Sequence, residues 1–105
     1  MIILPAIDLK DGRCVRLFQG DYATAEQVAA DPVATAKSFE ADGARWMHVV
    51  DLDGAKARRP VNDATIFSIR DNTSLNIEVG GGIRDMEGVE YYLSRGVNRV
   101  ILGSA

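Results

Sequence analysis

The stretch Leu75-Asn76-Ile77-Glu78-Val79-Gly80-Gly81-Gly82 decides between the two folds that this sequence allows. Its first five residues form a short, largely apolar run, which is typical of a buried strand. Three glycines follow at once, and glycine lets the backbone come close to another group because it has no side chain. The place of this strand and loop in the order of elements therefore indicates the architecture.

Three helices are predicted around this strand. Each begins with a residue type that caps helices and ends near a glycine or an asparagine. The caps are Asp31, Asn62 and Asp85, and the expected ends lie near Gly43, Asn72 and Gly96. The residues expected to face the core are Val33, Ala36 and Phe39 in the first helix, Ile66 and Ile69 in the second, and Met86, Val89 and Leu93 in the third.

Short apolar runs predict three further strands, over residues 2–7, 46–51 and 99–102. A turn signal over residues 10–13 predicts a hairpin whose second strand runs from Cys14 to Phe18. Strands and helices then alternate along the chain. This alternation predicts a parallel sheet with right-handed crossovers.

Two parallel architectures compete at this point. An open doubly wound sheet usually places its glycine loop after the first strand, but the first turn here, residues 8–12, lacks that pattern. The glycines follow the third strand instead, which favours a (β/α)₈ barrel, and a complete barrel needs about 250 residues. The predicted fold class is therefore α/β, the N-terminal half of a (β/α)₈ TIM barrel with parallel strands and a small β-hairpin after strand one. We expect one half-barrel domain over residues 1–105, made of three βα units plus a fourth strand.

Composition excludes several classes of function. The 105 residues carry a net charge of −3, so no basic field attracts nucleic acid or an anionic membrane. The lone cysteine, Cys14, cannot form an internal disulfide, which fits a reducing cytoplasm. The apolar start of the chain is too short to span a bilayer and no basic region precedes it, so we expect no signal peptide and a cytoplasmic location.

Asp8 follows the first predicted strand, and barrel enzymes carry their sites at the carboxyl ends of strands. Period-two alternation points Asp8 to the same side as Leu4 and Ala6, which we assign to the barrel interior. A carboxylate there can accept a proton from a carbon or an oxygen. The alternative interpretation is that Asp8 only caps the hairpin turn.

Two small-residue loops predict a phosphate site. Gly80 to Gly82 follow the third strand, and Gly103 with Ser104 follows the fourth, so both loops fall at one mouth of the barrel. Backbone N–H groups exposed by such loops near helix starts bind anions. Either loop alone is also compatible with a simple turn.

Three other positions allow a functional and a structural interpretation. His48 has the parity of Val50, so it faces the barrel interior either as a functional group or as a satisfied core residue. Arg84 is suited to bind a phosphate or a carboxamide, or is a surface charge. Cys14 is expected to be a small packing residue. The acidic pair after strand two lacks the rest of a calcium loop, so we expect no metal.

Four motifs together resemble one enzyme family. They are Leu4-Pro5-Ala6-Ile7-Asp8-Leu9-Lys10-Asp11-Gly12, Val15-Arg16-Leu17-Phe18-Gln19-Gly20-Asp21-Tyr22, His48-Val49-Val50-Asp51-Leu52-Asp53-Gly54-Ala55 and Val79-Gly80-Gly81-Gly82-Ile83-Arg84. Over essentially its whole length the chain resembles the N-terminal half of the phosphoribosylformimino-5-aminoimidazole carboxamide ribotide isomerase family of histidine biosynthesis.

This resemblance implies an Amadori rearrangement, an aldose–ketose isomerisation of the aminoaldose ProFAR to the aminoketose PRFAR, without a cofactor or a metal. By the resemblance Asp8 is the catalytic proton acceptor. The other positions that match the family's site are Arg16, His48 and Arg84, which contact the substrate, and Gly81, Gly82, Gly103 and Ser104, which form the first of two phosphate sites. The second catalytic aspartate and phosphate site belong to the other half-barrel, so we expect the chain alone to be inactive or very weak.

Two alternatives stay open. The sister cyclase, a subunit of imidazole glycerol phosphate synthase, shares the barrel, but it carries a catalytic lysine where this chain has Val15-Arg16-Leu17. His48 and the segment from Gln19 to Tyr22 also favour the isomerase. The second alternative is a non-catalytic half-barrel that associates with itself. The partners we expect are a small phosphorylated ribonucleotide and either a second copy or a C-terminal half-barrel, with no nucleic acid and no membrane.

Overall fold

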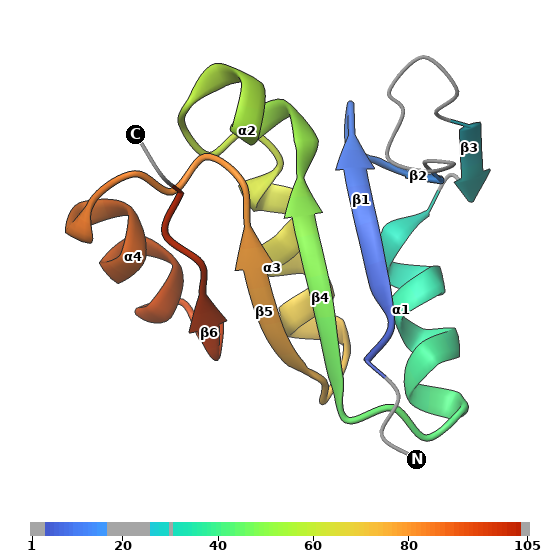
Figure 1. Cartoon of the computed structure of the whole chain (residues 1–105). Helices are drawn as coiled ribbons and strands as arrows, with labels where there is room; N and C mark the ends of the chain where they lie inside the picture. The colour runs from blue at the N-terminus through green and yellow to red at the C-terminus, as the bar shows by residue number, and fades with distance from the viewer. Residues whose placement is uncertain (1–3, 17–25, 30, 104–105) are drawn as a thin grey trace.

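A six-stranded sheet in the order β3-β2-β1-β4-β5-β6 organises the fold. The computed structural model describes residues 4–16, 26–29 and 31–103 (Figure 1). In chain order its elements are β1 (Ala6–Lys10), β2 (Arg13–Arg16), β3 (Glu26–Ala29), α1 (Pro32–Ala41), β4 (Trp46–Asp51), α2 (Leu52–Ala57), α3 (Asp63–Asn72), β5 (Asn76–Gly80), α4 (Met86–Leu93) and β6 (Arg99–Val100).

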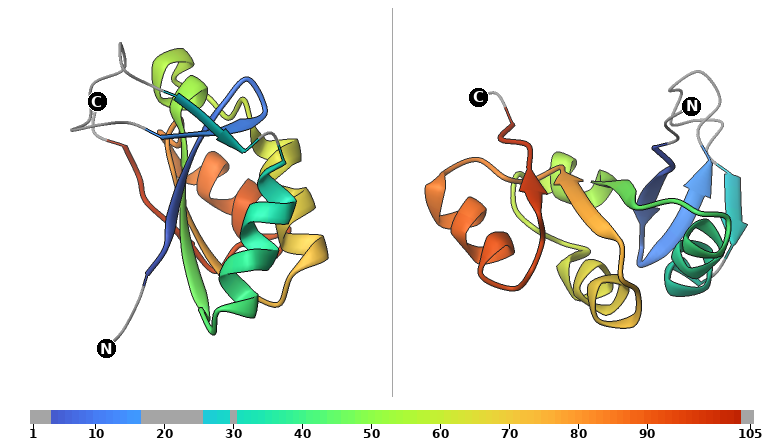
Figure 2. Two further views of the ribbon diagram at one scale, coloured as in Figure 1. Left: turned by 90° about the vertical axis from the view of Figure 1, so that its right-hand side faces the viewer. Right: turned by 90° about the horizontal axis from the view of Figure 1, so that it is seen from below.

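The sheet combines a parallel part with a short antiparallel extension. Strands β1, β4, β5 and β6 pair in parallel, whereas β2 pairs antiparallel with β1, and β3 with β2. Helices α1, α3 and α4 all lie on one face of the sheet, and α2 lies beyond the end of β4 (Figure 2). None of the described helices covers the opposite face. A parallel sheet with helices on one face and a hairpin after the first strand confirms the predicted fold class.

The core lies between the sheet and these helices. Alternate residues of the three central strands are buried there, as period-two geometry requires. They are Ile7 and Leu9 of β1, Met47 and Val49 of β4, and Ile77 and Val79 of β5. Ala36, Ile66 and Ile69 cover them from α1 and α3, which confirms the inward faces predicted for these helices. The residues that alternate with these buried ones therefore point away from the helices. We call the side of the sheet on which they lie the inner face.

Two helix caps form as the sequence predicts. The Oδ1 atom of Asp31 accepts hydrogen bonds from the N–H groups of Val33 and Ala34 at 2.9 and 3.3 Å. The Oδ1 atom of Asp85 accepts one from Gly88 at 2.9 Å. These bonds satisfy amides that have no partner inside the helix, and they fix where α1 and α4 begin.

Strand β1 differs from its prediction. It runs from Ala6 to Lys10, so it includes Asp8 rather than ending before it. The cause is the hairpin, because β2 pairs Asp8 with Val15 and Leu9 with Cys14 and so extends the ladder past the apolar run. The first three residues of the chain and residues 17–18 of the predicted hairpin strand lie outside the described residues.

The inward face of α4 also differs from its prediction. Met86 and Leu93 are exposed, whereas Tyr92 is fully buried and Val89 packs at the edge of the core. The large ring of Tyr92 fills the space between α4 and α3 beside Phe67, which turns Met86 and Leu93 outward. Two elements, α2 and β3, were not expected from the sequence, and β6 is two residues long rather than four.

No helix in the described ranges is both long enough and apolar enough to cross a membrane.

Candidate functional site

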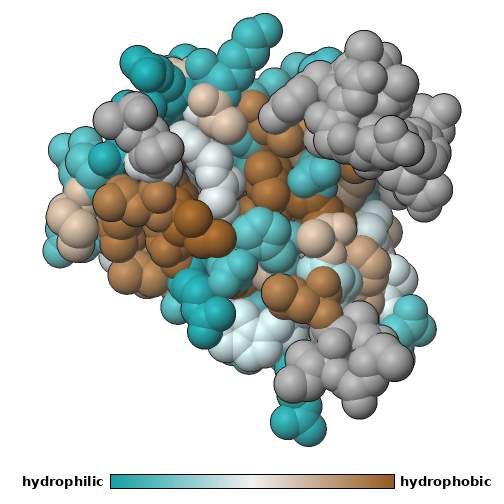
Figure 3. Space-filling model, in the orientation of Figure 1, coloured by the Kyte–Doolittle hydropathy of each residue, from teal (hydrophilic) through white to brown (hydrophobic). Residues whose placement is uncertain are grey.

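A row of side chains crosses the inner face at one level. The pairing register joins Ala6 of β1, His48 of β4, Glu78 of β5 and Arg99 of β6. One step nearer the carboxyl ends of the strands, a second row joins Asp8, Val50 and Gly80. Figure 3 shows this face, on which polar residues near the centre interrupt the apolar surface. Asp8 and His48, which the sequence assigned to the barrel interior, therefore both belong to this face.

His48 is tied to Glu78. The Nδ1 atom of His48 lies 2.6 Å from Oε1 of Glu78, and the two side chains are 22% and 15% exposed. The second carboxylate oxygen accepts a hydrogen bond from Nη1 of Arg99 at 3.2 Å. The guanidinium of Arg99 in turn lies over the ring of Trp46, 4.7 Å from its centroid. Each charged group on this part of the face has a partner, which lowers the cost of partial burial.

Asp8 does not cap the hairpin turn. The turn amides bond elsewhere: Asp11 N–H donates to Asp53 at 2.7 Å and Gly12 N–H donates to Asn62 at 2.9 Å. Desolvation raises the pKa of Asp8 above its ordinary value of 3.8, and the charge of His48 lowers it by a smaller amount. A carboxyl group whose pKa is moved toward neutrality is better matched to proton transfer.

Gly80 lies close to His48 on the inner face. A Cβ atom built at Gly80 would lie 3.9 Å from Cε1 of His48 and 3.8 Å from Cβ of Ile101. A larger side chain at this position would therefore project over the imidazole in the row that holds Asp8. Gly80 is buried, and its lack of a side chain lets the His48 ring and Ile101 lie close to β5.

The next two residues, Gly81 and Gly82, must be glycine because of their backbone conformation and their close backbone neighbours. Gly81 and Gly82 have φ angles of 101° and 82°, in the region that glycine favours. A Cβ at Gly81 would lie 2.3 Å from the carbonyl oxygen of Asp51, and one at Gly82 would lie 2.5 Å from that of Arg59. From the sequence alone, these glycines are expected to let the backbone approach a ligand. In the structure the close neighbours of these glycines are backbone atoms at the end of β4 and in the segment after α2.

The two predicted phosphate loops meet at the mouth of the sheet. The N–H of Gly103 donates to the carbonyl oxygen of Ile83 at 2.7 Å. The N–H of Gly103 therefore already has a hydrogen-bond partner in the protein and is not available to an anion. Ser104 lies outside the described residues, so the phosphate site stays a prediction for Gly81, Gly82, Gly103 and Ser104.

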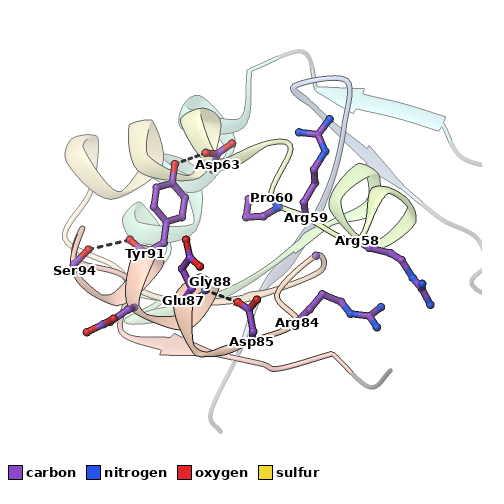
Figure 4. A pocket seen from close by; sticks show the side chains of 12 residues that line it. Arg58, Arg59, Pro60, Asp63, Arg84, Asp85, Glu87, Gly88, Tyr91 and Ser94 are labelled. Carbon is purple, nitrogen blue, oxygen red and sulfur yellow. Dashed lines mark hydrogen bonds between the residues drawn. The ribbon is translucent and has the colours of Figure 1, made fainter.

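Arg84 lines a pocket beside the start of α4 rather than the row of His48 and Glu78. Arg58 and Arg59 line the same pocket, and Figure 4 shows the side chains of Arg58 and Arg84 directed to the same side. Tyr91 donates a hydrogen bond to Asp63 on the other side of that view. Substrate contact by Arg84 stays a prediction.

Arg16 and Cys14 both lie in β2. The backbone of Arg16 pairs with that of Glu26, and its side chain lies outside the described part of the chain. Cys14 is 3% exposed, and its burial raises the pKa of its thiol. It is a packing residue, as predicted.

Asp51 and Asn62 form a buried network that was not expected from the sequence. Asp51 accepts hydrogen bonds from the backbone N–H groups of Gly54, Val61 and Asn62 at 2.8 to 2.9 Å. The Nδ2 of Asn62 also donates to Asp51 and to Asp53. Asn62 precedes α3 as predicted, but its side chain makes no cap bond because it is used here. The available signal was an acidic residue at the end of a buried strand, which needs partners to be tolerated.

Comparison with known proteins shows the family of the chain. The family described as "Histidine biosynthesis protein" matches residues 2–105. A relative from Caldicellulosiruptor bescii is 59% identical over 104 residues, which are 99% of this chain and 44% of the relative. One from Geobacillus thermodenitrificans is 56% identical over 103 residues, 98% of this chain and 42% of the relative.

A relative from Listeria monocytogenes is 53% identical over 105 residues, all of this chain and 44% of the relative. All three carry the name 1-(5-phosphoribosyl)-5-((5-phosphoribosylamino)methylideneamino) imidazole-4-carboxamide isomerase. The chain thus spans less than half the length of the curated relatives that it matches. Since the family match covers nearly every residue, the chain belongs to the histidine biosynthesis protein family.

Proposed function

We propose that this chain supplies the first half of the active site of an aldose–ketose isomerase that converts ProFAR to PRFAR by an Amadori rearrangement. The names of the curated relatives support this reaction over that of the sister cyclase. The observation that carries the proposal is the position of Asp8, on the inner face with its pKa raised by desolvation, in the neighbourhood of His48.

The reaction needs proton transfers and no redox partner. The sugar ring opens when its oxygen gains a proton, and the proton on C2 then leaves to give the enolamine form. A proton then returns to C1 while the hydroxyl on C2 gives up its proton to become the ketone, so the atoms balance within one substrate. A carboxylate beside C2 can take that proton, and a second acid on the other side of the substrate can serve the ring oxygen.

Asp8 is our candidate for the base at C2. His48 lies on the same face in the neighbouring strand β4, so a substrate placed against β1 and β4 would reach both side chains. The second acid would come from the remainder of the barrel. A site that holds only one of two acid–base groups typically loses orders of magnitude in rate, and we expect the chain by itself to be inactive or very weak.

One substrate phosphate would bind at the loops after β5 and β6. The two loops meet through the bond between Gly103 and Ile83. A small-residue loop at a strand end near the start of α4 is suited to an anion because backbone N–H groups and the helix dipole both favour negative charge. The amides that remain as candidates are those of Gly81, Gly82 and Ser104.

The inner face would be covered by a C-terminal half-barrel. Leu4 is 53% exposed and Ile101 is 45% exposed, and a soluble monomer rarely keeps such apolar surface together. The curated relatives are more than twice as long as the matched region, so the rest of the same barrel is the partner we favour. A second copy of the chain is the alternative occupant.

Mixing tests the proposal. The chain is combined with a separately produced C-terminal half from the Caldicellulosiruptor bescii relative, and conversion of ProFAR is followed by chromatography. We expect turnover from the mixture and little or none from either part. A well-formed complex that binds ProFAR without converting it would contradict the isomerase assignment. A chain that forms only homodimers and ignores the second half would support the self-associating alternative.

A further inference from the structure

We propose that Glu78 is a positioning residue: it holds the Nδ1 edge of His48, so that Nε2 is the ring nitrogen presented to a ligand beside Asp8. The inference rests on the proposed function for the role of that ligand, but the geometry of the pair is independent of it. Glu78 and Arg99 were not among the residues that the sequence assigned to the site.

The first support is the geometry of the pair. The distance of 2.6 Å between Nδ1 and Oε1 is that of a strong, charge-assisted hydrogen bond. The two residues are direct neighbours in the register of β4 and β5, the two strands with the longest pairing. A bond made between side chains of two paired central strands holds the imidazole at a fixed place on the sheet.

The second support is that Glu78 is itself held. Arg99 binds the carboxylate oxygen that His48 does not use, and the ring of Trp46 lies under the guanidinium. The plane of the carboxylate is therefore set from two sides, by β4 and by β6. A carboxylate fixed in this way can orient a histidine, as carboxylates do for histidines in many sites.

The third support concerns the two ring nitrogens. A carboxylate accepts and does not donate, so Nδ1 of His48 must carry a proton in this pair. Within the described residues Nε2 has no hydrogen-bond partner. The Cε1 atom of the ring lies 3.9 Å from the place that a Cβ atom at Gly80 would take. His48 therefore has one nitrogen bound to the protein and one available to a substrate oxygen.

The electrostatic surroundings agree with this role. The groups that face His48 are Asp8 from β1 and Glu78 from β5, and Arg99 from β6 faces Glu78. The charge of His48 lowers the pKa of Asp8 against the larger desolvation effect. When its ring is protonated, His48 thus favours the carboxylate form of Asp8, which is the form that accepts a proton.

The orientation is tested by nitrogen NMR on the chain itself. His48 is the single histidine of the sequence, so its ¹⁵N imidazole signals need no assignment. We expect Nδ1 to carry a proton in the wild type and in Glu78→Gln, whose amide oxygen can still accept. In Glu78→Leu we expect the pattern to move toward the form protonated at Nε2. The matched control is Glu90→Gln on the exposed side of α4, which should leave the signals unchanged.

The functional consequence is tested in the mixture with the C-terminal half. We expect kcat to fall about 10- to 100-fold in Glu78→Leu, by analogy with the loss of carboxylates that orient metal-bound histidines. KM should change much less, and Glu78→Gln should recover a large part of kcat. Circular dichroism and urea unfolding show whether each variant is folded. If Glu78→Leu does not fold, the kcat of Glu78→Gln still tests the inference.

The outcomes separate the two proposals. If the wild-type mixture has no activity, the proposed function fails, and the NMR result alone decides the role of Glu78. If the wild-type mixture is active, a folded Glu78→Leu variant with unchanged kcat overturns the inference. An unchanged imidazole pattern in that variant overturns it as well.

Discussion

The Nδ2 atom of Asn62 donates a hydrogen bond to Oδ1 of Asp51 at 2.8 Å, and both side chains are buried. Through this pair the β1–β2 turn, the end of β4 and the start of α3 become one unit, because Asn62 also binds the N–H of Gly12 and a carboxylate oxygen of Asp53. These segments lie at the carboxyl ends of β1 and β4, and Asp8 lies within β1 two residues before its end.

Removing Asn62 should therefore be costly. We expect Asn62→Ala to lower the free energy of unfolding by about 2–3 kcal/mol, because it leaves buried acceptors of Asp51 and the N–H of Gly12 with fewer partners. Urea denaturation measures the change. The matched control is Asn72→Ala, which removes an exposed bond to Ser68 and should cost about 0.5 kcal/mol or less. Equal losses in the two variants would show that the network does not stabilise the fold.

Removing the hydroxyl of Tyr92, unlike removing the side chain of Asn62, should not destabilise the fold. This hydroxyl is buried without a hydrogen-bond partner in the described part of the structure, and its pKa is raised, mainly by desolvation. Tyr92→Phe should leave stability unchanged or raise it by up to about 1 kcal/mol. Tyr91→Phe, which loses the bond to Asp63, should instead lower it. A clear loss of thermal stability in Tyr92→Phe would mean that the hydroxyl has a partner.

Two causes make a side chain costly in the glycine loop after β5, namely backbone strain and steric overlap, and two substitutions can tell them apart. Gly43 and Gly81 have similar positive φ angles, 96° and 101°, but a Cβ at Gly43 meets nothing within 4 Å. We expect Gly43→Ala to cost about 1–2 kcal/mol from backbone strain alone. Gly81→Ala adds the overlap with Asp51 and should cost at least about 2 kcal/mol more. Similar unfolding midpoints for the two variants would contradict the close approach.

The raised pKa of Asp8 makes stability depend on pH. The folded chain binds the proton of Asp8 more tightly than the unfolded chain does, so the stabilisation from this group is fully present below its ordinary value of 3.8. It is lost as pH rises through the higher folded value. Relative to Asp8→Asn, the wild type should lose stability over that range and then level off. Denaturation curves whose difference does not change with pH would contradict the desolvation of Asp8.

Much of the fold could be predicted because most of its elements carry a local signal. Asp31 and Asp85 cap their helices as expected, and β4 runs over the predicted residues. The face of α4 was predicted wrongly because helical spacing allows two adjacent stripes, and only packing against Phe67 selects the one that contains Tyr92. Element ends that depend on partners, such as those of β1 and β6, carry no local signal.

The residues of the candidate site also fall into those that the sequence predicts and those that it does not. Parity along single strands was enough to place Asp8 and His48 on the inner face. The role of Glu78 depends on the register between β4 and β5, which no single segment determines. The ties from Asp51 to Asn62 likewise join residues that only the folded chain brings together.

The central claim, that Asp8 is the base of an isomerase half-site, is tested most directly by the turnover of Asp8→Asn in the mixture with a C-terminal half-barrel. The substitution keeps the size of the side chain and removes its ability to accept the proton, and Asp11→Asn in the neighbouring turn is the control. We predict that kcat for ProFAR falls about 10²- to 10⁴-fold in Asp8→Asn, with little change in binding and no loss in Asp11→Asn. A folded Asp8→Asn mixture that keeps kcat near that of the wild type would contradict the account.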